Sequence, residues 1–121
     1  MPATNDVIFA KNSIATSVQG TLSHGLNSIS YNLNAEKGQY AIINMTPKIG
    51  ATEFANVGVL QMPSGKESGG KGGIVYQGCL PETGNYKLRI SRNLMATNGK
   101  AAGYVAEVVI LPKYASEDLC K

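Results

Sequence analysis

The sequence of 121 residues contains no tryptophan, one histidine and two cysteines, and charged residues make up only 16% of it. It holds no apolar run near the roughly 18 residues of a membrane-spanning helix, so no membrane segment is expected. Its Lys and Arg residues are scattered without interleaved aromatic residues, and the formal net charge is only +3. These features argue against binding to nucleic acid.

Patterns for catalysis and metal binding are missing as well. His24 lies in the turn-like Ser23–Gly25 segment, without an acidic or cysteine partner at ligand spacing. The acidic residues form no paired motif, and the Ser68–Gly73 segment (SGGKGG) lacks the GK[ST] end of a phosphate-binding loop. We therefore expect a protein that is not an enzyme and that uses no metal and no cofactor.

The pattern that is present is short strand-like runs separated by turn signals every eight to twelve residues, as in β-sandwiches. We expect one all-β domain over residues 1–121, an eight-stranded antiparallel β-sandwich of jelly-roll type, with residues 1–6 and 112–121 as tails. The length suits one domain with one core. The expected strands are Val7–Ala10, Ile14–Leu22, Leu26–Leu33, Gln39–Met45, Phe54–Met62, Ile74–Cys79, Asn85–Ile90 and Tyr104–Leu111.

The clearest local signal is the stretch Gly72–Ile90, where two strand-like runs flank a turn at Leu80–Gly84. Apolar and polar residues alternate in the second run, which predicts a strand with one buried face. Pro81 suits the first corner of a turn, and Gly84 can take the positive φ at its end. The sequence therefore predicts a β-hairpin. We expect long loops on both sides of it, at Pro63–Gly73 and Arg92–Gly103, and such loops are suited to binding.

The two cysteines, Cys79 and Cys120, are far apart and match no metal-binding spacing. A disulfide between them would fasten the C-terminal tail to the sheet and indicates an oxidising compartment. The alternative is two unrelated thiols, one buried and one at a frayed end, and we favour the disulfide. The N-terminus, MPATNDVIFA, lacks the basic start and apolar middle of a signal peptide. Our interpretation is that Met1 follows the position of a removed signal.

Three segments resemble one family of bacterial proteins. Tyr76–Ile90 (YQGCLPETGNYKLRI) resembles the G-x-L-P-x-x-G-x-Y-x-[IL]-R-[VI] hairpin of periplasmic lysozyme inhibitors of the i-type and g-type classes, and of related pre-peptidase C-terminal domains. Ile8–Lys11 with Gln19–Leu22 is similar to their opening motif, and Tyr31–Gln39 (YNLNAEKGQ) to their Y-x-L-N-A-K-A-G-Q segment. The resemblance covers residues 7–111.

This resemblance implies a β-sandwich secreted to the periplasm that blocks a host lysozyme by inserting a loop into its sugar-binding cleft. In i-type inhibitors the loop before the G-x-L-P turn carries a Ser-Gly-x-Tyr-like motif. Tyr76 occupies the tyrosine position here, whereas Ser68 and Gly69 lie further upstream than the family pattern places them. In g-type inhibitors arginines of the loop after the hairpin enter the cleft, and only Arg92 and Lys100 are basic in that region. This departure favours i-type over g-type lysozyme as the partner.

A lysozyme cleft carries two carboxyl groups, so an inhibitor needs hydroxyl groups and cations held on ordered loops. The alternative for each candidate is a solvated loop residue, and for Tyr76 a core residue. A second function that fits the resemblance is a carbohydrate- or protein-binding accessory domain of the pre-peptidase type. The oligomeric state stays open, with a homodimer among the alternatives. The residues expected to bind lysozyme are Ser68, Gly69, Lys71, Tyr76, Arg92 and Lys100.

Overall fold

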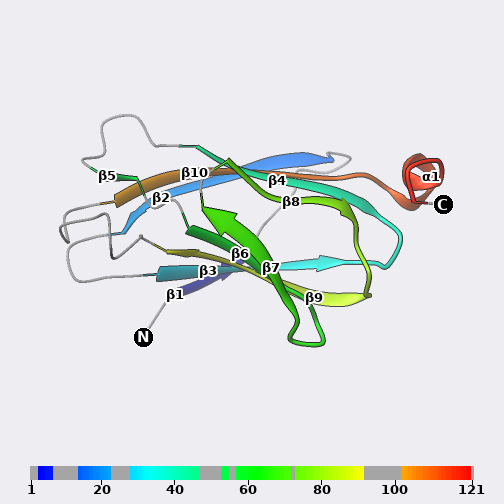
Figure 1. The fold of residues 1–121 in the computed structure, drawn as a ribbon, viewed down its shortest axis with the longest axis horizontal. Coiled ribbons are helices and arrows are strands. Elements are labelled where there is room, and N and C mark those ends of the chain that lie inside the picture. The colour runs from blue at the N-terminus through cyan, green and yellow to red at the C-terminus, as the bar shows by residue number, and fades with distance from the viewer. Residues whose placement is uncertain are drawn as a thin grey trace.

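Two β-sheets pack face to face in the computed structural model of the chain (Figure 1). The structure describes residues 3–6, 14–22, 28–46, 53–54, 57–71, 73–91 and 102–120. Sheet A has the strand order β1 (Ala3–Asp6), β3 (Ser28–Ala35), β9 (Gly84–Ser91), β6 (Val57–Gln61) and β7 (Glu67–Lys71). Sheet B has the order β2 (Ala15–Leu22), β10 (Ala102–Ile110), β4 (Tyr40–Thr46) and β8 (Gly73–Cys79), with β5 (Glu53–Phe54) beside β10.

The prediction of an all-β sandwich is confirmed. Seven of the eight expected strands correspond to β2, β3, β4, β6, β8, β9 and β10, while Val7–Ala10 lies outside the described residues. The short strands β1 and β5 and the strand β7 add to the expected set. Two of them, β1 and β5, pair in parallel with β3 and β10, so the sheets are antiparallel except at these short additions.

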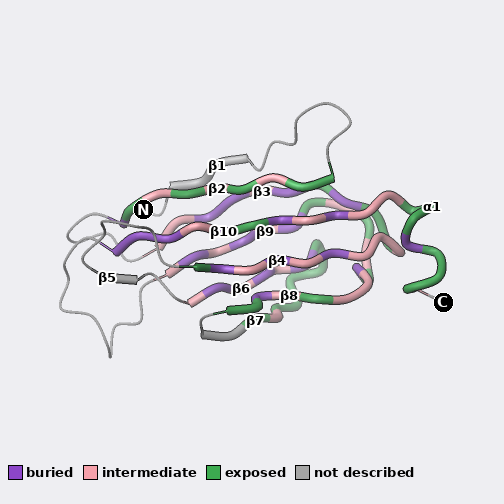
Figure 2. Tube along the Cα trace, turned by 90° about the horizontal axis from the view of Figure 1, so that it is seen from above, coloured by how far each residue is buried: buried purple, intermediate pink, exposed green. Residues whose placement is uncertain are grey.

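Alternating side chains of both sheets form the core between them. In β9, Tyr86, Leu88 and Ile90 are fully buried, as their period-2 spacing predicts, while the residues between them face outward. The same alternation buries Ala102, Tyr104, Ala106, Val108 and Ile110 of β10, and Figure 2 shows buried and less buried positions following one another along the strands. Burial of both inner faces is the main source of stability in such a sandwich.

A hydroxyl pair joins the two sheets inside this core. The Tyr31 and Tyr104 hydroxyl oxygens lie 2.5 Å apart, and the two rings meet edge to face with centroids 6.3 Å apart. Both residues are buried, and within the described part of the chain each hydroxyl has the other as its hydrogen-bond partner. Burial, and then the hydrogen bond to Tyr31, raises the pKa of Tyr104 above the ordinary value of a phenol.

The predicted hairpin at Gly72–Ile90 is wrong in its pairing. Its two strands exist, but β8 pairs with β4 in sheet B, whereas β9 pairs with β3 and β6 in sheet A. Leu80–Thr83 is therefore a crossing between the sheets. Alternation along a strand shows which residues face the core but does not show which strand lies beside it, so the sequence could not decide this point.

Local hydrogen bonds explain why the chain crosses there. Leu80 is buried, and its backbone is held by the preceding turn through Leu80 N–H to Gln39 O (2.8 Å) and Gly38 N–H to Leu80 O (2.9 Å). The buried Tyr86 hydroxyl donates to Glu82 O (2.5 Å) and accepts from Glu82 N–H (3.0 Å). Gly84 takes φ +146°, as predicted, and a Cβ there would lie 3.1 Å from Pro63.

The predicted glycine-rich loop at Pro63–Gly73 is wrong for most of its length. It is a tight turn closed by Met62 N–H to Lys66 O (2.7 Å), followed by strand β7, which pairs with β6. Glycines lower strand propensity, but here they allow a close approach of two backbones. A Cβ at Gly69 would clash with the Gly58 carbonyl oxygen and lie 2.8 Å from the Val59 Cα.

The segments expected as tails also carry regular structure. Ala3–Asp6 forms β1, and Lys113–Ser116 forms the short helix α1 at the C-terminal end. A four-residue helix is too short for a periodic signal in the sequence.

We expect the Tyr31–Tyr104 pair to be coupled in a double-mutant cycle. Tyr31→Phe or Tyr104→Phe leaves one buried hydroxyl without a partner and should lower the free energy of unfolding by about 1–3 kcal/mol. The double variant should cost clearly less than the sum of the two single variants. Urea unfolding of the four proteins measures this, and strictly additive costs would contradict the pairing.

The same pair predicts a loss of stability at high pH. A phenol of the unfolded chain ionises near pH 10, whereas the raised pKa keeps Tyr104 protonated in the folded protein. Its contribution is therefore complete below about pH 10 and falls above it, by at most about 1.4 kcal/mol per pH unit. Tyr104→Phe should show a shallower loss between pH 10 and 12 in urea unfolding, and identical slopes would contradict this assignment.

Candidate functional site

The two ends of the sandwich differ in how they are closed. At one end lie α1, the turn between β3 and β4, and the crossing from β8 to β9; we call it the disulfide end. At the opposite end, which we call the loop end, β2, β4, β7 and β9 finish and β3, β6, β8 and β10 begin. Two sets of paired residues mark this end. Val57 pairs with both Lys71 and Ser91 in sheet A, and Leu22 pairs with Ala102 in sheet B.

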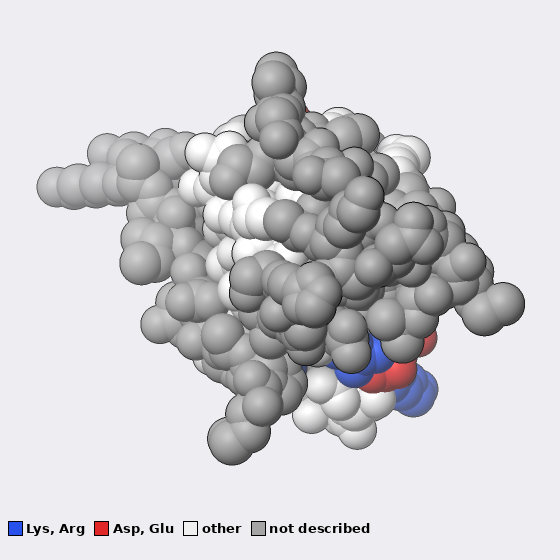
Figure 3. All heavy atoms as spheres, turned by 90° about the vertical axis from the view of Figure 1, so that its left-hand side faces the viewer, with Lys and Arg blue, Asp and Glu red and all other residues white. Residues whose placement is uncertain are grey.

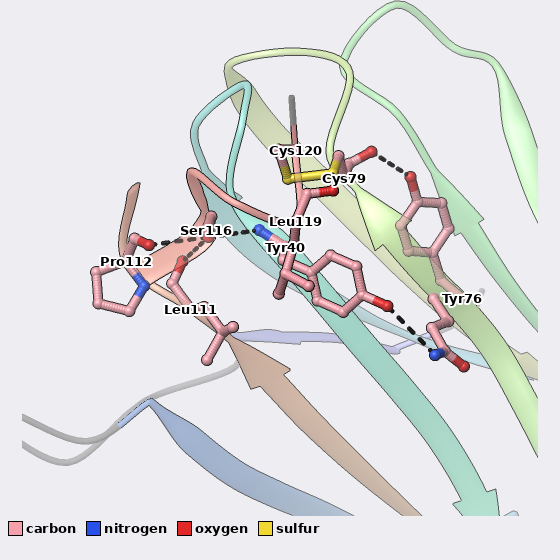
Figure 4. The surroundings of a disulfide bond; sticks show 9 residues. Tyr40, Tyr76, Cys79, Leu111, Pro112, Ser116, Leu119 and Cys120 are labelled. Carbon is pink, nitrogen blue, oxygen red and sulfur yellow. Dashed lines mark hydrogen bonds between the residues drawn. A yellow bond between two sulfur atoms is a disulfide. The ribbon is translucent and has the colours of Figure 1, made fainter. Parts of the chain in front are cut away.

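The disulfide end is fastened by a covalent bond and by hydrogen bonds (Figure 4). Cys79 and Cys120 form the predicted disulfide, with Cα atoms 5.7 Å apart. The fully buried Ser116 accepts a hydrogen bond from Tyr40 N–H (2.9 Å) and donates to Pro112 O (2.8 Å). This serine therefore ties α1 to the first residue of β4, and the tail is an integral part of the fold.

The predicted site residues of β7 and β8 lie on one open side of the sandwich, where these two edge strands are in contact. On β7, Ser68 is half-buried and pairs with Leu60 of β6, and the neighbouring Gly69 is exposed. Tyr76 on β8 packs against the core, and its hydroxyl donates to Cys79 O (2.7 Å). Burial raises the pKa of the Tyr76 hydroxyl. Gly69 and Tyr76 therefore contribute to the fold, Gly69 through its close contact with β6 and Tyr76 through packing against the core.

Lys71 lies at the loop end, as do the described residues Ser91 and Ala102 that flank the segment with Arg92 and Lys100. Lys71 is the last residue of β7, and its register partner Val57 also pairs with Ser91, the residue before Arg92. The backbones at Lys71 and Ser91 are therefore two strand spacings apart, about 10 Å. Arg92 and Lys100 themselves lie outside the described residues, as does His24. Topology brings the flanks of three predicted cations to the same end of the molecule.

Some charged side chains of the described residues can be seen from the loop end. The visible blue and red atoms lie mainly in the lower part of this view (Figure 3). On sheet A, Arg89 forms an ion pair with Glu67 (3.2 Å), and Lys87 follows on the same face of β9. The part of the chain that the structure describes contains no group of three or more His, Cys, Asp or Glu residues that could hold a metal ion.

Comparison with known proteins places this architecture among solved folds. The structure is similar to that of PliG from Aeromonas hydrophila, a periplasmic lysozyme inhibitor of g-type lysozyme, with a TM-score of 0.72 and 21% identity over 91% of this chain and 98% of that chain. PliG from Salmonella Typhimurium gives a TM-score of 0.70 and 19% identity over 92% and 100% of the two chains. The pre-peptidase C-terminal domain of collagenase from Bacillus anthracis gives 0.59 and 17% over 92% and 97%.

At these identities the likeness shows the fold. No protein-family model matches the sequence, and no curated protein matches it. The resemblance to periplasmic lysozyme inhibitors and pre-peptidase C-terminal domains is thus confirmed as a structural likeness. The similar inhibitors are described as acting on g-type lysozyme, so the i-type class stays a prediction. No helix among the described residues is long and apolar enough to cross a membrane.

One feature of the surface was missed by the sequence analysis. Glu107 lies on the outer face of sheet B between Val105 and Val109, in an open hollow of about 320 Å³ that Ala15 and Ser17 help to line. The available signal was that Glu107 is the one charged residue of the Tyr104–Leu111 run.

We expect loss of the disulfide to destabilise the whole domain. Replacing both Cys79 and Cys120 by Ser opens a loop of 41 residues and should lower the free energy of unfolding by about 4 kcal/mol in the chain-entropy model. Guanidinium unfolding with and without dithiothreitol measures this. The parent protein should lose stability on reduction while the double variant does not respond, and equal stability of parent and variant would contradict the prediction.

Proposed function

We propose that the chain is a periplasmic, non-enzymatic inhibitor of lysozyme that binds the enzyme through its loop end. The observation that carries this proposal is that the fold matches PliG structures over 91–92% of this chain and 98–100% of theirs. The quoted segments, which include Tyr76–Ile90, support the same family independently of the structure. An inhibitor of this kind needs a rigid scaffold with presented side chains rather than a catalytic cleft.

The chemistry of the target explains why cations at one end of the sandwich suit this role. Glycosidases of the lysozyme type work with a pair of carboxyl groups in a cleft. Lys71, Arg92 and Lys100 can form charge-assisted hydrogen bonds to such groups, and Ser68 adds a hydroxyl on the strand that leads to Lys71. The disulfide and the Ser116 contacts fix the opposite end, so the scaffold loses little entropy on binding.

Two observations favour different classes of lysozyme. The structural neighbours are inhibitors of g-type lysozyme, which makes this class the first to test. The tyrosine at position 76, and the lack of further arginine in the Asn93–Lys100 region, favour the i-type class. In the present structure the Tyr76 hydroxyl would have to leave Cys79 O before it could bind a carboxyl group.

Titration of g-type, i-type and c-type lysozyme with the purified protein tests the function. We expect stoichiometric loss of activity against one class, measured as the rate of clearing of a bacterial cell-wall suspension. The variant without the disulfide serves as a control below its unfolding temperature. It is still folded there and should inhibit, because the bond lies at the opposite end from the proposed contact. No inhibition of any class at micromolar concentration would refute the proposal.

Variants at the two ends of the molecule test the binding surface. Lys71→Ala, Arg92→Ala and Lys100→Ala should each raise the inhibition constant by about tenfold to a hundredfold, because each removes a hydrogen bond between charged groups. Lys113→Ala at the disulfide end, where Lys113 lies 3.9 Å from Glu36, is the matched control and should leave inhibition unchanged.

Ser68→Ala and Tyr76→Phe test the open side of β7 and β8 by removing one hydroxyl each without a large change in packing. If inhibition were weaker in these two variants alone, lysozyme would bind this side of the sandwich and not the loop end. Weaker inhibition in Lys113→Ala alone would move it to the disulfide end and contradict the proposed surface.

A second candidate function rests on the likeness to the pre-peptidase C-terminal domain. An accessory domain of this kind would bind polysaccharide or protein without inhibiting any lysozyme. Co-sedimentation with insoluble cell wall, chitin and collagen separates the two functions, because saturable binding without inhibition is expected only for the accessory domain.

A further inference from the structure

The outer face of sheet B carries a hollow that the proposed function does not use. We call it the Glu107 hollow, and its volume is about 320 Å³. It lies on the outer face of the strands β2 and β10, which are neighbours in Figure 2, whereas the loop end is marked by strand termini such as Leu22 and Ala102. It is lined by Ala15, Thr16, Ser17, Val105, Glu107 and Val109.

The register of sheet B explains why a hollow forms at this place. Glu107 pairs with Ser17 on β2, and Val109 pairs with Ala15. The side chains on β2 are small, while those of β10 are larger and half-buried at Val105 and Val109. β2 is the terminal strand of sheet B in the described part of the chain, so the hollow opens toward the edge of the sheet.

The lining combines apolar side chains with one acidic group. Two valines flank a single carboxylate, and Glu107 forms no ion pair or hydrogen bond with any of the described residues. On its other side Glu107 pairs with Asn44 of β4, whose side-chain oxygen is buried and finds no hydrogen-bond donor among the residues that the structure describes. Glu107 is therefore the one charged group of the hollow, with Val105 and Val109 on either side and the hydroxyl groups of Thr16 and Ser17 beside it.

This combination selects a ligand with a hydrocarbon stem and a donor-rich cationic head. Alkyl groups contact the valines, and the head donates charge-assisted hydrogen bonds to the carboxylate. The volume is at the lower limit of small-molecule sites, which are about 300–1,000 Å³, and it is open. The lining has no second charged group for the α-amino and α-carboxyl groups of a free amino acid, so the cation is best supplied by a side chain of a larger partner.

We propose that the Glu107 hollow is a docking site for an arginine or lysine side chain of a protein partner, separate from the loop end. The partner presents this side chain over Ala15 and Ser17 at the edge of sheet B. Its stem packs between Val105 and Val109, and its cationic head binds Glu107. The proposal does not depend on lysozyme inhibition.

A titration monitored by NMR tests this site without any lysozyme. The ligand is the blocked tripeptide acetyl-Val-Arg-Val-amide, and its control replaces arginine by citrulline, which has nearly the same shape but no charge. We expect amide shifts centred on Ser17, Val105 and Val109, and about fivefold weaker binding for the citrulline peptide. Glu107→Gln should weaken binding of the arginine peptide by the same factor, while the exposed Glu117→Gln should not change it.

Several outcomes would overturn the proposal. Equal affinity of the two peptides, shifts centred outside the hollow, or unchanged binding to Glu107→Gln would each remove Glu107 as the recognition group. Tighter binding of free arginine than of the blocked peptide would make the site one for a small molecule. A dimer that sedimentation detects in the parent protein and not in Glu107→Gln would make a second copy of this chain the occupant.

Discussion

The crossing at Leu80–Thr83 is the constraint on which the two-sheet arrangement depends. It carries the chain from the edge of sheet B to the centre of sheet A, so its geometry sets how β8 and β9 stand relative to each other. Three different contacts hold it: the buried Leu80 side chain, the backbone bonds to Gly38 and Gln39, and the Tyr86 hydroxyl on Glu82. Glu82 also accepts hydrogen bonds from the backbone and hydroxyl of Ser64. The crossing thus links the turn between β6 and β7 with the turn between β3 and β4.

The disulfide end and the loop end differ in what holds them together. Covalent and hydrogen-bonded contacts accumulate around Cys79, Cys120 and Ser116, where rigidity is needed. The opposite end is built from strand termini, at which side chains can vary without disturbing the ladders. A binding surface that is carried by one end of a sandwich can therefore change while the core stays the same, and this agrees with fold likeness at about 20% identity.

The sequence predicted the strands well, because burial of one face imposes a period of two that composition alone reveals. Tyr86, Leu88 and Ile90 are the clearest example. It failed at pairing, as in β8 and β9, because the partner of a strand is chosen by the whole sandwich. It also failed at β7, where glycines that suggest a loop serve a close contact with β6. Of the candidate site residues, Tyr76 packs against the core and Gly69 allows the close contact with β6. The proposed role of Lys71, Arg92 and Lys100 would depend on a partner, and such a role leaves no periodic signal in the sequence.

The place of β10 in sheet B has a consequence for the order of folding. This strand is the last in the chain, yet it lies between β2 and β4, so Leu22 finds its partner only at Ala102. Sheet B cannot assemble while the C-terminal segment is still being synthesised, and pairings so distant in sequence form slowly. The last step in forming sheet B is therefore the insertion of β10 between β2 and β4, and the core between the two sheets closes only with this step.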